Sequence, residues 1–192
     1  MEEHFNHRAE SFDSPKNTFL AQLVYNQIRR QVPDLSGKTI LDFGGGTGLI
    51  ALPLAKDAKS VTLVDIADKM LDQARIKAKK QELQNLTFLC RDLLAEPLEE
   101  NFDLIIVSRV LHHMLDLNKT LVLFHRHLKD QGQLFIADYT KTSKSHHGFI
   151  IADLEEDLRQ GGFSDIKSQI LYSSDHLFLG NPSQLFLTSA KK

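Results

Sequence analysis

Short runs of apolar, often β-branched residues alternate along the chain with longer amphipathic stretches. Strands repeat every two residues and helices every 3.6, so this alternation predicts strands connected by helices. The predicted strands are 39–43, 60–64, 86–89, 102–107, 133–137, 165–172 and 184–188. The predicted helices are approximately 14–32, 48–56, 68–82, 117–128 and 151–160. Ser14 and Pro15 favour a helix start, because a capping hydroxyl followed by proline suits the first turn.

The strand pattern also predicts how the sheet is built. Strand 102–107 is almost wholly apolar, as expected when helices cover both faces of a parallel sheet. No helical pattern separates the last two strands, so we expect them to form a hairpin. The chain is therefore predicted to be an α/β protein with a doubly wound, seven-stranded, mostly parallel sheet and one antiparallel strand. Ligands of such sheets bind beyond the carboxyl ends of the strands.

Composition narrows the class of protein. The chain has 42% hydrophobic and 25% charged residues, which is typical of a globular domain. Its net charge is −2, with the basic residues scattered, so we expect neither a nucleic-acid partner nor a membrane surface. Cys90 stands alone, which excludes an internal disulfide and fits a reducing compartment. With no signal-peptide pattern and no apolar run of ~20 residues, we expect a cytoplasmic protein without a membrane span.

The most informative segment is DFGGGTG, residues 42–48, between a predicted strand and a predicted helix. Glycine lets the backbone approach a ligand closely, and free N–H groups at the helix start can bind polar ligand atoms. The same segment satisfies the dinucleotide pattern G-x-G-x-x-G/A, so glycines alone leave a nicotinamide cofactor open. Asp65 ends the second strand, where a carboxylate can accept from ribose hydroxyls. Asp42 precedes the glycines, where it would repel a pyrophosphate but favour a cationic amino-acid group.

These residues resemble the motifs of class I S-adenosylmethionine-dependent methyltransferases. ILDFGGGTGLIALPLA (40–55) is similar to their first motif, D/E-x-G-x-G-x-G, and SVTLVDIADKMLDQA (60–74) to their second. LTFLCRDLLAEPL (86–98), FDLIIVSRVLHHMLD (102–116) and LKDQGQLFIADY (128–139) follow in the family's order. The opening HFNHRAESFDSP resembles that of the small-molecule methyltransferases of quinone biosynthesis, whose N-terminal segment folds over the cofactor.

The resemblance implies a single methyltransferase domain over residues 1–192. Residues 1–32 would form a lid or helical segment, 38–140 the cofactor-binding core, and 141–192 a substrate loop, a helix and the terminal hairpin. Contacts to S-adenosylmethionine are implied for Phe12, Asp42, Gly44, Gly45, Gly46, Gly48, Asp65, Ile66, Met70, Asp92, Leu93 and Ser108. Two of these residues have an alternative structural interpretation. Asp92 could cap a turn, and Met70 could be a core residue.

Two histidine pairs are candidates for the chemistry on the methyl acceptor. His112 and His113 follow the fourth strand, where a histidine can take a proton from an acceptor or simply shape the pocket wall. His146 and His147 lie in the loop after the fifth strand and are candidate substrate contacts, or solvated loop residues. Adjacent side chains point apart, so one such pair seldom supplies two ligands to one metal, and we expect no metal site.

The predicted function is therefore direct SN2 methyl transfer from S-adenosylmethionine to an unidentified small molecule, releasing S-adenosylhomocysteine. Ser108-Arg109-Val110-Leu111 stands where methyltransferases of nucleic-acid and glutamine amino groups often carry N/D-P-P-Y/F, which disfavours that subclass. Two alternatives remain: a non-catalytic subunit that binds S-adenosylmethionine or activates a partner, and an NAD-dependent oxidoreductase. The sequence leaves the oligomeric state open.

Overall fold

The computed structural model describes residues 2–141 and 148–192. The chain divides into two compact units, Met1–Leu98 and Glu99–Lys192, which are described separately. No helix among the described residues has the length and apolar character that crossing a bilayer would require.

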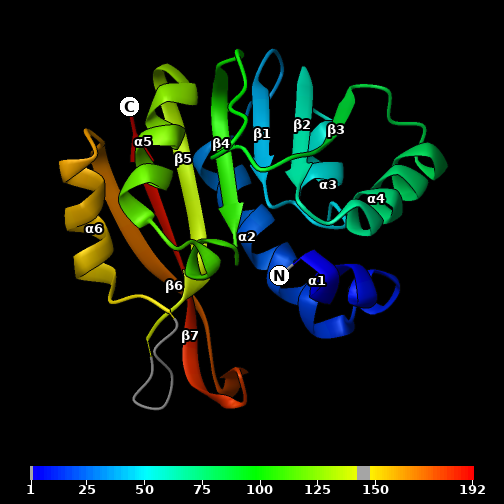
Figure 1. The fold of residues 1–192 in the computed structure, drawn as a ribbon. Coiled ribbons are helices and arrows are strands. Elements are labelled where there is room, and N and C mark those ends of the chain that lie inside the picture. The colour runs from blue at the N-terminus through cyan, green and yellow to red at the C-terminus, as the bar shows by residue number, and fades with distance from the viewer. Residues whose placement is uncertain (1, 142–147) are drawn as a thin grey trace. The chain divides into compact units, whose positions relative to one another are not determined.

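Three parallel strands form the centre of the first unit: β1 (Thr39–Phe43), β2 (Ser60–Asp65) and β3 (Leu86–Cys90) (Figure 1). β2 lies between β1 and β3, with Asp42 opposite Leu63 and Asp65 opposite Cys90. β1 and β2 are almost entirely buried, whereas β3 alternates between half-buried and exposed. The carboxyl ends of the three strands consequently lie at one edge.

The helices of the first unit begin and end close to the predicted positions. They are α2 (Pro15–Gln31), α3 (Ala51–Ala55) and α4 (Asp68–Lys80). The Ser14 hydroxyl accepts from the Asn17 N–H at 3.2 Å and Pro15 occupies the first turn, as the sequence predicts. α3 is shorter than expected because the glycine turn extends further, to residue 50.

An additional N-terminal helix, α1 (Glu2–Arg8), continues into the short 3₁₀ helix η1 (Ala9–Ser11). Both pack against α4, and the Lys69 N–H donates to the side-chain oxygen of Asn6 at 3.0 Å. No residue of α1 is buried, so its sequence lacks the apolar stripe that would predict a helix.

The second unit holds β4 (Phe102–Ser108), β5 (Leu128–Tyr139), β6 (Ser164–Phe178) and β7 (Asn181–Lys191). β4 and β5 are parallel, and β7 lies antiparallel between β5 and β6. Its helices are η2 (Leu111–His113), α5 (Leu117–His127) and α6 (Ile151–Gln160) (Figure 1). The predicted terminal hairpin is confirmed, as is the single strand that runs antiparallel to its neighbours.

The strands of the second unit are longer than the sequence pattern indicates. β5 begins at Leu128 rather than near Gln133. Gln131 lies in the left-handed region at φ 60°, and the pairing of β4 with β5 shifts register between Phe102 and Leu104. β6 and β7 extend to a turn at Leu179 and Gly180, because polar residues of the hairpin pair in antiparallel register. Since Tyr139 at the end of β5 lies opposite Leu185, the first residues of β7 continue past the carboxyl end of β5.

Candidate active site

The glycine turn between β1 and α3 is held against the end of β2. The N–H groups of Gly44 and Gly45 both donate to the Val64 carbonyl, at 2.8 and 3.1 Å. Gly44, Gly46 and Gly48 have φ angles of 67°, 55° and 79°, in the left-handed region that residues with a Cβ rarely adopt. The backbone path of the turn therefore depends on these glycines.

Gly45 and Gly46 differ in what surrounds them. A Cβ at Gly45 would lie 2.7 Å from Leu63 Cγ and 2.8 Å from Asp42 Oδ2, so only hydrogen fits between the turn and the strands. A Cβ at Gly46 would come no closer than 3.9 Å to Asp65 Oδ2 and to the Phe12 ring. The side of the turn that faces Asp65 and Phe12 is therefore more open than the side that faces β1.

Asp42 is a buried carboxyl group under the glycine turn, with only 2% of its surface exposed. Burial raises its pKa to about 7, and the charge of Asp65 adds to the increase, while a hydrogen bond from the Ala51 backbone opposes it. Among the residues that the structure describes, its Oδ2 atom has no hydrogen-bond partner. Burying an acid in this way costs free energy unless a positive group or donor is supplied, and a ligand can supply it.

Asp65 ends β2 and binds two backbone donors. Its Oδ2 accepts from the Gly46 N–H and its Oδ1 from the Ala67 N–H, both at 2.9 Å. Burial raises the pKa of this carboxyl despite its backbone hydrogen bonds to Ala67, Gly46 and Ile66. Asp42, the glycine turn and Asp65 therefore converge at the carboxyl ends of β1 and β2, where a ligand was expected.

The N-terminal segment packs beside this convergence. Phe5 and Phe12 contact an apolar cluster formed by Ala9, Ala67 and Met70. Met70 is 1% exposed and is therefore a core residue of this cluster.

Asp13 is a contact of this segment that sequence reasoning missed. One of its oxygens accepts from the Thr47 hydroxyl, next to the glycine turn, and the other pairs with Lys77 of α4 at 2.5 Å. The segment that begins the chain is in this way bonded to both the glycine turn and α4.

Leu93 and Asp92, the two predicted S-adenosylmethionine contacts after β3, are placed differently from one another. Leu93 is buried at 1% exposure, but Asp92 is exposed. The Asp92 side chain accepts from the Leu94 N–H at 2.9 Å, and its carbonyl accepts from Ala95 and Glu96. Asp92 thus caps a turn in this structure. Ile66, directly after Asp65, is half-buried, and its carbonyl accepts from the Cys90 thiol.

In the second unit, His112 and Asp138 form a buried pair. Asp138, near the end of β5, is completely buried, and the His112 side chain is 6% exposed. Asp138 Oδ1 lies 2.7 Å from His112 Nδ1, and its Oδ2 accepts from the His112 N–H at 3.2 Å. The ring of His113 lies 4.0 Å from that of His112. Asp138 lies at the carboxyl end of its strand, as Asp42 and Asp65 do, and this pattern could have indicated it.

Aromatic and polar side chains surround this pair. The Phe178 ring, at the tip of the terminal hairpin, stacks on Tyr139 at 4.5 Å and meets His112 edge-on at 5.1 Å. Burial raises the pKa of the Tyr139 hydroxyl, while the positive charge of Arg109 and a hydrogen bond from its side chain oppose part of the increase. The Ser108 hydroxyl, at the end of β4, is buried with no hydrogen-bond partner among the described residues.

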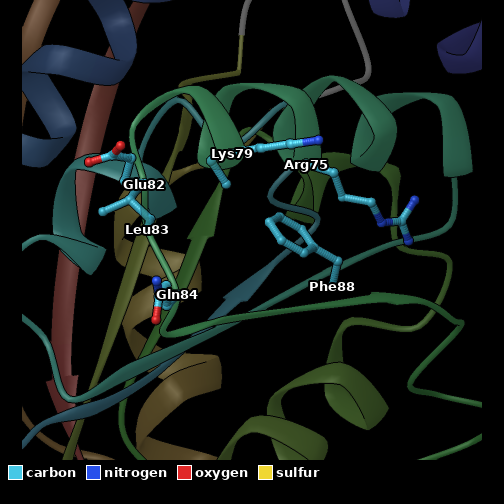
Figure 2. Close-up of a pocket in the computed structure, with 7 residues that line it drawn as sticks. Arg75, Lys79, Glu82, Leu83, Gln84 and Phe88 are labelled. Carbon is cyan, nitrogen blue, oxygen red and sulfur yellow. The ribbon is translucent and has the colours of Figure 1, made fainter.

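Other predictions fall outside these two clusters. His146 and His147 lie outside the described residues. Within the described ranges, no three acidic, histidine or cysteine side chains gather closely enough to hold a metal. A groove of about 720 Å³ lies between α4 and β3, lined by Arg75, Lys79, Phe88 and four neighbours (Figure 2). Some of the lining residues precede β3 and so lie at the amino end of that strand, whereas Asp42 and Asp65 lie at the carboxyl ends of β1 and β2. The groove is therefore separate from the candidate site.

Comparison with known proteins identifies the class. The sequence profile of a family described as "Methyltransferase domain" matches residues 34–175. The ubiquinone/menaquinone biosynthesis C-methyltransferase UbiE of Rickettsia bellii is 33% identical over 73% of this chain, and the ubiquinone biosynthesis O-methyltransferase of Rickettsia typhi is 28% identical over 71%. The chain belongs to the methyltransferase domain family, and the resemblance to class I S-adenosylmethionine-dependent methyltransferases is confirmed. The chain spans 61% and 56% of the length of these two relatives.

Solved structures establish the fold. Magnesium protoporphyrin IX methyltransferase from Synechocystis, crystallised with bound S-adenosylmethionine, matches 90% of this chain and 79% of its own length with a TM-score of 0.72 at 24% identity. The doubly wound, mostly parallel α/β fold predicted from the sequence is therefore confirmed. The cofactor expected from the sequence is the one that this neighbour contains.

Proposed function

We propose that this protein transfers the methyl group of S-adenosylmethionine to a small-molecule acceptor. The observation that carries the proposal is the convergence of Asp42, the glycine turn and Asp65 at one strand edge. A buried acid with an unpartnered oxygen fits the α-ammonium group of the cofactor, and an acid at the end of β2 fits its ribose hydroxyls. Asp42 would repel the pyrophosphate of NAD, which argues against the oxidoreductase alternative, whereas Asp65 suits the ribose of either cofactor.

The cofactor supplies a methyl group that its positive sulfur already activates for displacement. The protein's own contribution is to align the acceptor with that methyl group and to exclude water. Asp42 would hold the ammonium group of the cofactor and Asp65 its ribose, and Gly46 would leave room for the cofactor between Asp65 and Phe12. His112, with His113 beside it, is the proposed group that receives a proton from the acceptor. Met70, Leu93, Ile66 and Asp92 are proposed around the adenine, and Ser108 at the edge of the cofactor site.

The two curated relatives carry names from quinone biosynthesis, one a C-methyltransferase and the other an O-methyltransferase. We propose a small aromatic acceptor of this kind. The family match runs from residue 34 to 175 and so includes parts of both compact units, which supports the proposal of a single methyltransferase domain. The single cysteine supports a reducing, cytoplasmic location.

Binding of S-adenosylhomocysteine to the full chain, measured by isothermal titration calorimetry, tests the cofactor assignment. Gly46→Val fills the open side of the turn in a left-handed position, and Asp65→Ala removes the proposed ribose acceptor; both are expected to lose binding. Asp92→Ala tests the adenine contact separately and is expected to cost at most a few-fold, since this side chain caps a turn. Affinity for NADH without affinity for S-adenosylhomocysteine, or wild-type binding by Gly46→Val, would refute the assignment.

A screen of phenols, hydroxylated quinones and amines for release of S-adenosylhomocysteine tests catalysis. Turnover of at least one acceptor is expected, and it should stop in Gly46→Val. Tight cofactor binding without turnover of any acceptor would favour the non-catalytic alternative instead.

A further inference from the structure

We infer that Asp138 is a positioning residue that holds His112 with its proton on Nδ1 and its lone pair on Nε2, so that the acceptor is a hydroxyl compound that gives up a proton. The inference rests on the proposed methyl transfer and deepens it. It assigns a role to a buried acid that the sequence motifs do not identify, and it names the chemical class of the acceptor.

The hydrogen bonds of Asp138 determine which atoms carry protons. Its Oδ1 accepts from the Tyr139 N–H at 2.8 Å, and its Oδ2 accepts from the His112 N–H at 3.2 Å. Both partners are backbone N–H groups, which can only donate, so they favour Asp138 as an ionised acceptor. The third contact, 2.7 Å between Oδ1 and His112 Nδ1, is then a hydrogen bond that Nδ1 donates. A neutral imidazole with a proton on Nδ1 has an unprotonated Nε2.

The backbone around His112 is shaped to make this contact. Arg109 follows β4 in the left-handed region at φ 59°, an unfavourable conformation for a long side chain, while its N–H donates to the Ala137 carbonyl at 2.7 Å. This bend leads into η2 and brings His112 back to the end of β5. Backbone strain of this kind persists only where the surrounding structure enforces it, and it is common at functional sites.

The ring orientation of His112 is fixed as well. Phe178 meets the ring edge-on at 5.1 Å, and Tyr139 lies 6.0 Å away. A base whose rotation is restricted by aromatic neighbours keeps Nε2 in one direction, which favours proton transfer in a single geometry. The structure assigns this role to His112 rather than His113, because it is the His112 ring that bonds the buried carboxylate.

The proposed step balances without any further reactant. The acceptor oxygen uses a lone pair to form a bond to the methyl carbon, and the bond between that carbon and sulfur breaks with its electron pair going to sulfur. The acceptor's hydroxyl proton moves to His112 Nε2, and Asp138 stabilises the resulting imidazolium. The proton then passes to water. An acceptor with no proton to release would gain nothing from this arrangement.

The tautomer of His112 can be observed without knowing the acceptor. In two-bond ¹H–¹⁵N correlation spectra of the 192-residue chain, assigned with His112→Gln, the wild-type ring is expected to show a protonated Nδ1 and an unprotonated Nε2. In Asp138→Asn one neutral amide oxygen replaces the two carboxylate oxygens that serve three donors, so Nδ1 holds its proton less strongly and the share of rings protonated on Nε2 is expected to rise. Asp103→Asn removes another acid of the second unit, paired with Lys129 at its surface, and should leave the tautomer unchanged. A wild-type ring protonated on Nε2 overturns the proposal by itself.

Kinetics with a phenolic acceptor found in the screen provide the second test. Asp138→Asn is expected to lower kcat by about 10²-fold or more while KM and the affinity for S-adenosylhomocysteine change less than threefold. The O-methyl ether of the same phenol should not be methylated. An unchanged kcat in a folded Asp138→Asn protein, or efficient methylation at carbon or at the ether, overturns the proposal. If wild-type protein fails to bind S-adenosylhomocysteine, the proposed function fails while the tautomer result still stands.

Discussion

The burial of Asp42 makes a prediction about pH that can be worked out from the structure. Its pKa is raised from an ordinary 3.8 to about 7, by burial first and by the charge of Asp65 second. Each pKa unit corresponds to about 1.4 kcal/mol, so ionising Asp42 in the folded protein costs about 4 kcal/mol more than in the unfolded chain. The perturbation that removes this cost is Asp42→Asn, which keeps the shape of the side chain but cannot ionise.

The sign follows from proton binding. Between about pH 4 and pH 7 the folded state holds the Asp42 proton more tightly than the unfolded chain, so the free energy of unfolding falls as the pH rises. Above about pH 7 the loss is complete. Asp42→Asn lacks this loss, so we expect it to match wild type near pH 4 and to exceed it by up to about 4 kcal/mol at pH 8.

Urea denaturation followed by circular dichroism measures this difference directly, since the chain has no tryptophan to report by fluorescence. Asp153→Asn, which changes an exposed acid of α6, is the matched control and should follow wild type at every pH. If the difference in unfolding free energy between Asp42→Asn and wild type is the same at pH 4 and at pH 8, the assignment of a raised pKa to Asp42 is wrong. A variant that loses stability at high pH would contradict that assignment as well.

Ligand affinity should change in the opposite direction. If ionised Asp42 binds the ammonium group, about one tenth of the protein is competent at pH 6 and about nine tenths at pH 8, so the Kd for S-adenosylhomocysteine should fall about ninefold. Asp42→Asn should bind weakly, with little change over this range. A Kd that rises with pH in wild type would show that Asp42 binds no cation.

Three further changes have defined expectations. Asp13→Ala removes the bonds to Thr47 and Lys77. It should weaken S-adenosylhomocysteine binding several-fold and speed amide hydrogen exchange in residues 2–12. Unchanged exchange would show that these bonds do not hold the N-terminal segment. Gly45→Ala places a methyl group in space that is already filled and should cost about 1–3 kcal/mol in urea denaturation, so a neutral effect would mean that the turn can shift freely. Ser14→Ala removes the cap of α2 and should cost about 1 kcal/mol in the same assay, with Ser174→Ala in the terminal hairpin as a control expected to remain close to wild type.

Most helices and strands could be predicted from the pattern of apolar residues, because burial determines where those residues stand. α2, α4, α5 and α6 each carry an apolar stripe, and β1, β2 and β4 are apolar runs, so their positions could be read directly. α1 could not be predicted, because it buries none of its own residues and is placed by contacts with α4. The outer half of the terminal hairpin, with its serines, Asp175 and Asn181, has the composition of a loop and becomes strand only through pairing across the hairpin.

The candidate site was predictable where its residues are close in sequence. Asp42 and the glycines form one continuous motif, and Asp65 follows from its place at the end of a strand. The contact between His112 and Asp138 joins residues 26 positions apart, so no local pattern reveals it. Asp13 depends in the same way on Thr47 and Lys77, which lie 34 and 64 residues further along the chain. The sequence indicates which residues end strands, while the pairing of their side chains is a property of the fold.

The order of these groups along the chain has an evolutionary consequence. Apart from Ser108, every residue proposed to bind the cofactor lies between positions 12 and 93, whereas His112, Asp138 and Phe178 all lie in the second unit. On these proposed assignments, mutations or recombination that alter residues 99–192 would change the compound that is methylated and leave the proposed donor-binding residues 12–93 intact. Such a division allows a lineage to acquire new acceptors without rebuilding its methyl supply, and it suggests exchanging the second half between relatives as a route to altered specificity.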